Sequence, residues 1–138
     1  MHDEIARRTY GGLRAAAGAA GGLASRAVAG RGGPLSTSPR GAAVLGAVNG
    51  LIGDALEREQ SALQEPMSIR AGGRAIAPAE LGAAFAGVSP RIVVFAHGLM
   101  ETEFSWGLGG HEPYGERLRE ELGYTPVYVR YNTGRHIS

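Results

Sequence analysis

A histidine and a glycine directly follow the most apolar run of the chain. Residues 92–96 read Ile-Val-Val-Phe-Ala, and His97 and Gly98 come next. Apolar runs of this length that are rich in β-branched and aromatic residues are typical of buried strands. An imidazole placed where such a strand ends is a candidate general base or metal ligand. We therefore expect the chemistry of this chain at the turn that follows residue 96.

A metal site at this turn is the weaker interpretation. Glu101 and Glu103 lie close to His97, but their spacing is not that of an H-E-x-x-H helix, and the next histidine is His111. The chain also has no cysteine, which excludes thiolate ligands. We expect no metal and no cofactor, and we interpret Glu101 and Glu103 as loop-surface or loop-fastening groups.

The elements around the turn have the order of an α/β fold. Residues 113–122 have the pattern of a helix with Leu118 and Leu122 on its inner face, and Gly123 is a typical helix end. Residues 125–131 form a second apolar strand, so the stretch from residue 91 onward predicts a parallel βαβ unit. The continuous apolar run at 92–96 further predicts a strand buried on both faces.

A hairpin and a short helix precede this unit. Residues 67–71 and 74–76 alternate in polarity around Gly72-Gly73, which is a strong hairpin signal. Residues 78–85 have the composition of a short helix with Pro78 in its first turn.

This order of elements resembles the opening of the α/β-hydrolase fold. Residues 92–99, Ile-Val-Val-Phe-Ala-His-Gly-Leu, resemble the strand and oxyanion turn of bacterial lipases and esterases. Residues 114–118 and 123–138 are similar to a bacterial lipase-like branch related to the domain of GPI inositol-deacylases. The resemblance covers residues 67–138 and implies the N-terminal part of an α/β-hydrolase sheet, with the strand at 92–96 beside the strand at 126–131.

The resemblance also assigns roles to the turn. The backbone N–H of Leu99, or that of the adjacent Met100, would hold the oxyanion of a tetrahedral intermediate. Gly98 would let the chain turn without a Cβ clash. His97 would fasten the loop and would not be the catalytic base.

Aromatic residues of the following loop are candidates for substrate binding. Phe104 and Trp106, with Leu108, would line an acyl or leaving-group pocket. Burying the loop is an equally good role for these side chains.

The nucleophile of the family is missing from the sequence. It lies in a G-x-S-x-G elbow after a later strand, and no serine here has that context. The nearest match, around Ser89, lacks the second glycine and precedes the apolar strand. We therefore expect the N-terminal portion of a serine hydrolase. The complete protein would cleave a carboxylic ester or lipid through an acyl-enzyme, and this chain alone would be inactive.

Residues 1–66 have no counterpart in that fold. Residues 4–29 and the stretch from Ser38-Pro39 to Pro66 predict an Ala/Gly-rich helical hairpin, so we expect two domains, 1–66 and 67–138. In the second helix the predicted buried stripe runs through Val44, Leu45, Val48, Leu51, Ile52, Ala55, Leu56 and Leu63. The hairpin would pack on the following domain or on its own copy, or act as a lid over an apolar substrate.

The composition limits the classes of partner and of chemistry that the sequence supports. A formal net charge of +1 gives no argument for nucleic acid, and the absence of lysine excludes Schiff-base chemistry. We expect a cytoplasmic protein, leave peripheral membrane contact open, and expect an ester or lipid-like small molecule as substrate. The alternative is a non-catalytic interaction module that self-associates through residues 1–66 or an open strand edge.

Overall fold

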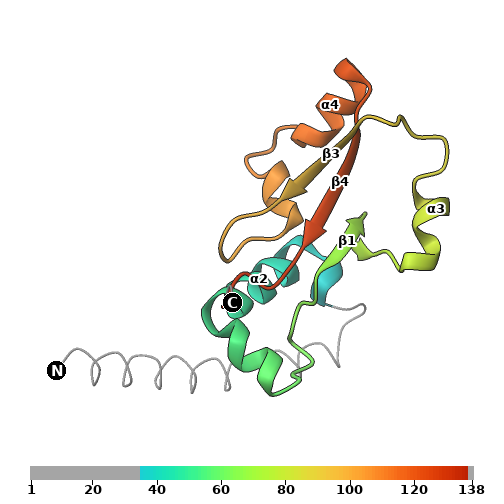
Figure 1. Cartoon of the computed structure of the whole chain (residues 1–138). Helices are drawn as coiled ribbons and strands as arrows, with labels where there is room; N and C mark the ends of the chain where they lie inside the picture. Colours follow the sequence, from blue (N-terminus) through green and yellow to red (C-terminus); the bar gives the residue numbers. More distant parts are fainter. Residues whose placement is uncertain (1–34, 137–138) are drawn as a thin grey trace.

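A computed structural model describes residues 35–136 of the chain (Figure 1). The helix expected at residues 4–29, and with it the expected helical hairpin, lies outside the described residues. The described part has a mixed α/β fold with these elements in chain order: η1 (Leu35–Thr37), α2 (Pro39–Arg58), β1 (Ser68–Ala71), β2 (Arg74–Ala75), η2 (Pro78–Glu80), α3 (Leu81–Ala84), β3 (Ile92–Ala96), η3 (Glu103–Gly107), α4 (Tyr114–Leu122) and β4 (Thr125–Arg130).

The four strands form one sheet in the order β2-β1-β4-β3. β3 and β4 are parallel, with Val94 opposite Val127, and η3 and α4 lie between them in the chain. β1 is antiparallel to both β2 and β4. The predicted hairpin and the predicted parallel pair are therefore confirmed, and β3 lies at an edge of this sheet.

The local sequence at the end of α4 determines where the helix ends and where β4 begins. Gly123 follows the helix with a φ of 67°, in the left-handed region that favours glycine, and its N–H donates to the carbonyl of Arg119. Thr125 then begins β4, and its N–H donates to the carbonyl of Arg91 at 2.7 Å. The predicted helix and strand are thus joined by a two-residue connection.

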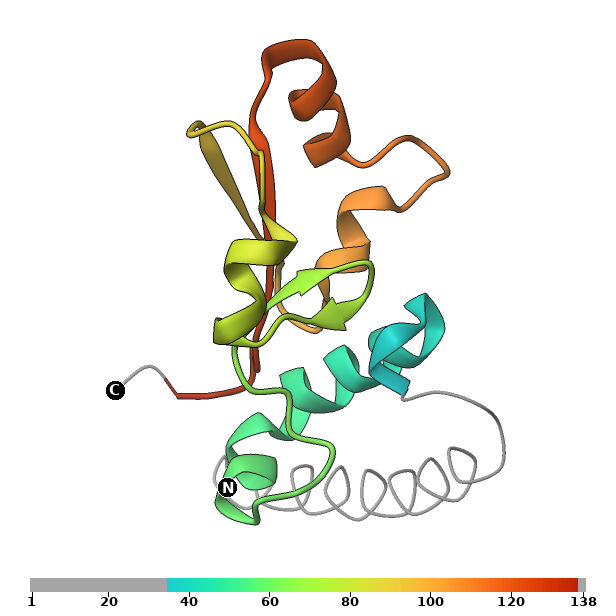
Figure 2. The same cartoon turned by 90° about the vertical axis from the view of Figure 1, so that its right-hand side faces the viewer.

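The two helical elements between β3 and β4 lie on the same face of the sheet. Figure 2 shows η3 and α4 on the same side of β4, where Phe95 is buried against Trp106. On the other face Ile92 and Val94 are each 60% exposed. The expectation that β3 is buried on both faces is wrong for the described residues, because nothing among them covers the second face. Leu122, expected to face inward, is also exposed.

α2 begins as predicted and ends earlier. Ser38 caps it, since its hydroxyl accepts the N–H of Gly41 at 3.1 Å, and Pro39 is the first helical residue. The helix ends at Arg58, well before Pro66, and a non-helical φ of −135° at Ile52 marks a kink inside it.

The buried face of α2 differs from the predicted apolar stripe. Leu45 and Leu56 are buried as expected, but Val44 is 51% and Leu51 is 41% exposed. The other buried positions are small or polar: Gly41, Ala42, Gly46, Asn49 and Gly53. The prediction for Val44 and Leu51 is wrong because hydropathy does not register glycines, and it is the glycine face that lets α2 approach neighbouring backbone closely.

α2 lies across the carboxyl ends of β3 and β4 (Figure 1). Its contacts reach the loop after each strand, at Met100 and at Asn132. Residues 35–58 are therefore packed against the loops that follow β3 and β4, the first of which carries the His-Gly turn. Within residues 35–136, no helix combines the length and apolar character needed to cross a bilayer.

Candidate functional site

The chain turns sharply directly after β3. The N–H of Glu101 donates to the carbonyl of Gly98 at 3.2 Å, and the carboxylate of Glu101 accepts the N–H of Gly98 at 3.0 Å. Met100 has a φ of 62°, in the left-handed region that a residue with a side chain rarely adopts. Two hydrogen bonds between Gly98 and Glu101 thus close the turn, and Met100 is held in a strained backbone conformation.

The two candidate oxyanion donors differ in their surroundings. The N–H of Met100 donates to the hydroxyl of Thr133 at 3.1 Å, in the segment that follows β4. The N–H of Leu99 donates no hydrogen bond within residues 35–136, and the Leu99 residue is 64% exposed. Of the two donors, only that of Leu99 has no partner among the described residues.

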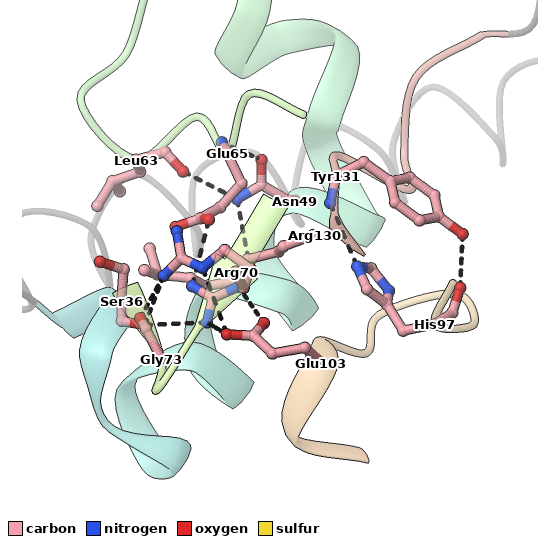
Figure 3. Close-up of polar contacts among 11 residues, drawn as sticks. Ser36, Asn49, Leu63, Glu65, Arg70, Gly73, His97, Glu103, Arg130 and Tyr131 are labelled. Carbon is pink, nitrogen blue, oxygen red and sulfur yellow. Dashed lines mark hydrogen bonds and ion pairs between the residues drawn. The ribbon is translucent and has the colours of Figure 1, made fainter. Parts of the chain in front are cut away.

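His97 fastens this turn to the end of β4 (Figure 3). The imidazole is 3% exposed and stacks on the ring of Tyr131, with 4.4 Å between ring centroids. Its Nε2 accepts the N–H of Tyr131 at 3.3 Å, and its carbonyl accepts the Tyr131 hydroxyl at 2.5 Å. Its Nδ1 lies 3.0 Å from the carbonyl of Gly98, which assigns the proton to Nδ1. Both ring nitrogens are therefore engaged inside the protein.

An open cavity of about 420 Å³ lies at this end of the sheet. It is formed by the turn after β3 and by the segment after β4. Its lining residues are His97, Gly98, Leu99, Tyr131, Asn132, Thr133, Arg135 and His136. Crevices at the carboxyl ends of parallel strands are where open α/β sheets bind ligands, so this cavity is the candidate site.

The predicted substrate-binding aromatics lie elsewhere. Phe104 lines a separate cavity of about 580 Å³, together with Met100, Leu108 and Tyr128. Trp106 lies outside both cavities. The two cavities have no lining residue in common. The structure thus brings Leu99 together with the segment after β4, and not with Phe104.

Trp106 has a packing role. Its ring lies edge-on to Phe95 and to Tyr114, at centroid distances of 5.1 and 6.4 Å. Its indole Nε1 is buried and has no hydrogen-bond partner among the described residues. These contacts match the alternative role considered for this residue, that of burying the loop.

A buried cluster of four charged side chains anchors the same loop, and sequence reasoning did not predict it (Figure 3). Arg130 is 1% exposed and forms a bidentate pair with Glu103, with both N–O distances at 2.6 Å. Its Nη1 also lies 3.3 Å from Glu65. The Oε1 of Glu103 also accepts a hydrogen bond from the Nε of a second arginine, Arg70, at 3.3 Å. Two positive and two negative groups therefore meet with no net charge.

Burial and the neighbouring charges shift the pKa of Arg70 in this cluster. Desolvation by burial, followed by the nearby Arg130 guanidinium, lowers the pKa of Arg70, while the Glu103 and Glu65 carboxylates act in the opposite direction. The carbonyl of Ser36 accepts both arginines, at 3.2 and 2.9 Å. The cluster therefore ties η1 and two strands to Glu103 at the start of η3.

Asn49 of α2 completes this anchoring. It is 1% exposed, and its amide donates to the carbonyls of Leu45 and Leu63 at 2.9 and 2.8 Å. Its oxygen accepts the N–H of Glu65 at 3.0 Å, which positions Glu65 toward Arg130. The only signal for the cluster in the sequence was the presence of Arg70 and Arg130 inside apolar strands.

The described residues offer no grouping of three or more imidazole and carboxylate side chains able to hold a metal ion. No family model matches the chain, and no curated protein or solved structure matches it either.

Proposed function

We propose that this chain supplies the oxyanion-binding part of a serine hydrolase of the α/β-hydrolase fold. The observation that carries the proposal is the N–H of Leu99. It is the donor left open in a turn whose neighbouring N–H groups, those of Gly98, Met100 and Glu101, are all bonded within the protein. A preorganised backbone donor of this kind stabilises the negative charge that develops on a carbonyl oxygen during acyl transfer.

The position of the donor supports the proposal. Leu99 follows the carboxyl end of a parallel strand and lines the cavity formed with the segment after the next parallel strand. Arg135 lines the same cavity, and its guanidinium is paired with Glu57 at 2.6 Å, so the support for an oxyanion comes from the backbone donor and not from a free positive charge. The arrangement suits a carboxylic ester, including the ester of a lipid.

The remaining catalytic groups would come from outside residues 35–136. His97 is unsuited to act as general base because both its nitrogens are engaged with the protein. β3 is an edge strand of the described sheet, so a further strand can pair with it, and in this fold such a strand would carry the nucleophile.

Turnover of a p-nitrophenyl ester tests the proposal. The 138-residue chain should release no p-nitrophenol above background. The same chain continued through the coding sequence that follows Ser138 in its gene should release it, and a fluorophosphonate should abolish the activity. An extended chain that is inactive, or a stop codon directly after Ser138, contradicts the proposal.

A second candidate function is a non-catalytic assembly module. It is favoured by the two exposed valine and isoleucine side chains of β3, Val94 and Ile92, on an edge strand. Sedimentation velocity should then give a dimer that Val94→Lys dissociates, while Val88→Lys, at an exposed position outside the strands, should leave it intact. A monomer at micromolar concentration contradicts this alternative.

A further inference from the structure

We propose that α2 is the positioning element of the oxyanion donor, and that Gly46 and Gly50 hold the backbone of Met100 so that the N–H of Leu99 stays open. The catalytic part of this inference, that the Leu99 N–H binds an oxyanion, rests on the proposed function. The structural part, that α2 holds the turn in place, rests on the contacts alone. It assigns a role to a helix that the resemblance leaves without a counterpart.

The contacts between α2 and the turn leave no room for a side chain. A Cβ at Gly50 would lie 2.5 Å from the Cγ of Met100 and 3.0 Å from its Cα and N. A Cβ at Gly46 would lie 2.8 Å from the carbonyl oxygen of Glu101 and 2.9 Å from that of Met100. The two glycines are one helical turn apart, so they present one face to the turn.

The same helix also holds the partner of the Met100 N–H. The side-chain amide of Asn132 donates to the carbonyl of Gly53 at 3.0 Å, and a Cβ at Gly134 would lie 2.8 Å from the carbonyl oxygen of Gly50. Thr133, which accepts the Met100 N–H, lies between these two contacts. α2 therefore sets both ends of the hydrogen bond that joins the two loops.

The conformation of Met100 needs such support. Its φ of 62° is unfavourable for a residue with a side chain and persists only where surrounding contacts determine it. If Met100 relaxed to a negative φ, its N–H would leave Thr133 and the peptide that carries the Leu99 N–H would rotate with the turn. The helix contacts are thus directly linked to the direction of the proposed donor.

Amide hydrogen exchange of the 138-residue chain, followed by NMR, tests this inference. Gly50→Ala should lower the protection of the Met100 amide by tenfold or more, while the amides of β3 and β4 keep theirs. Gly82→Ala is the matched control, because Gly82 is also helical and a Cβ there would meet nothing within 4 Å. A folded Gly50→Ala protein with unchanged Met100 protection overturns the inference.

A rescue experiment separates positioning from general stability. Met100→Gly in the Gly50→Ala background removes the Cγ contact and relieves the left-handed φ, so it should restore part of the protection at residue 100. The same change should not rescue Gly46→Ala, whose contacts are with carbonyl oxygens. Equal rescue of both variants contradicts the proposed geometry.

Two further measurements distinguish a failure of the positioning role from a failure of the variant to fold and from a failure of the proposed function. If Gly50→Ala does not fold, the wild-type chain should still show a nuclear Overhauser effect between the Gly50 Hα and the Met100 amide proton, and its absence overturns the inference. In an active extended chain, Gly50→Ala should lower kcat and leave KM unchanged, because the donor acts in the transition state. If the extended chain is inactive, the proposed function fails while the exchange result still decides the positioning role.

Discussion

Two polar regions border the loop after β3, and they differ in how their donors are used. In the cluster around Arg130, each guanidinium nitrogen of that arginine is bonded and the side chain is 1% exposed. At the turn around Leu99, the residue is 64% exposed and its N–H is unbonded among the described residues. The difference shows that the cluster fixes the loop, and it is consistent with the proposal that the turn binds an oxyanion.

The largest expected effect is the loss of the buried cluster. Arg130→Met leaves Glu103 and Glu65 buried with fewer partners, and removing one member of a buried ion pair costs about 3–5 kcal/mol of unfolding free energy. Urea denaturation followed by circular dichroism measures the loss. Arg117→Met is the control, since its pair with Glu121 is exposed and such pairs contribute about 0–1 kcal/mol. Equal effects of the two substitutions would remove the contrast between cluster and surface.

A smaller effect is expected where the turn is fastened. Tyr131→Phe removes the hydrogen bond to the carbonyl of His97 but keeps the ring that stacks on its imidazole. The net loss should be about 1 kcal/mol of unfolding free energy, the usual contribution of one hydrogen bond. Tyr114→Phe is the control because Tyr114 is half exposed and its hydroxyl has no hydrogen bond in the described part of the chain. A loss of several kcal/mol would place this tyrosine with the buried cluster instead.

The smallest effect concerns an exposed pair and depends on pH. The N–H of Ala77, and then the Arg74 guanidinium, lower the pKa of Glu80 from its ordinary value of 4.5. A carboxyl whose pKa is lowered by folding adds stability above its unfolded pKa, and that contribution is lost as the pH falls through the folded pKa. Wild type and Glu80→Gln should therefore differ slightly in unfolding free energy at pH 7 and converge at low pH. A difference that grows on acidification contradicts this assignment.

Most elements were predictable because their signals are local. The apolar run before His97, the Ser38-Pro39 helix start and Gly123 at a helix end each act within a few residues. The buried face of α2 was not predictable from hydropathy. Gly46, Gly50 and Gly53 pack closely because they have no side chain, and hydropathy gives no signal for that. The buried cluster joins Glu65, Glu103 and Arg130 across 27 to 65 residues, and no local pattern indicates such pairs.

The location of the candidate site was predicted, whereas the catalytic roles remain predictions. The resemblance implied the roles of Leu99 and His97, and the structure places both residues at the cavity between the two loops. The grouping of Phe104 and Trp106 with them does not follow from sequence distance, because the loop runs from one cavity to the other through Met100.

Replacement of a single backbone N–H by an ester oxygen tests the central claim most directly. In the extended chain, incorporation of the α-hydroxy analogue of leucine at position 99 removes that donor and keeps the side chain, and it also weakens the carbonyl of Gly98, which accepts the N–H of Glu101. We predict that kcat for a p-nitrophenyl ester falls by about 10²–10³, the loss typical of one oxyanion donor, while Tm falls less than with the same replacement at Met100. The same replacement at Met100 should lower Tm, because its N–H is bonded to Thr133. Full activity with the ester at position 99 would contradict the account.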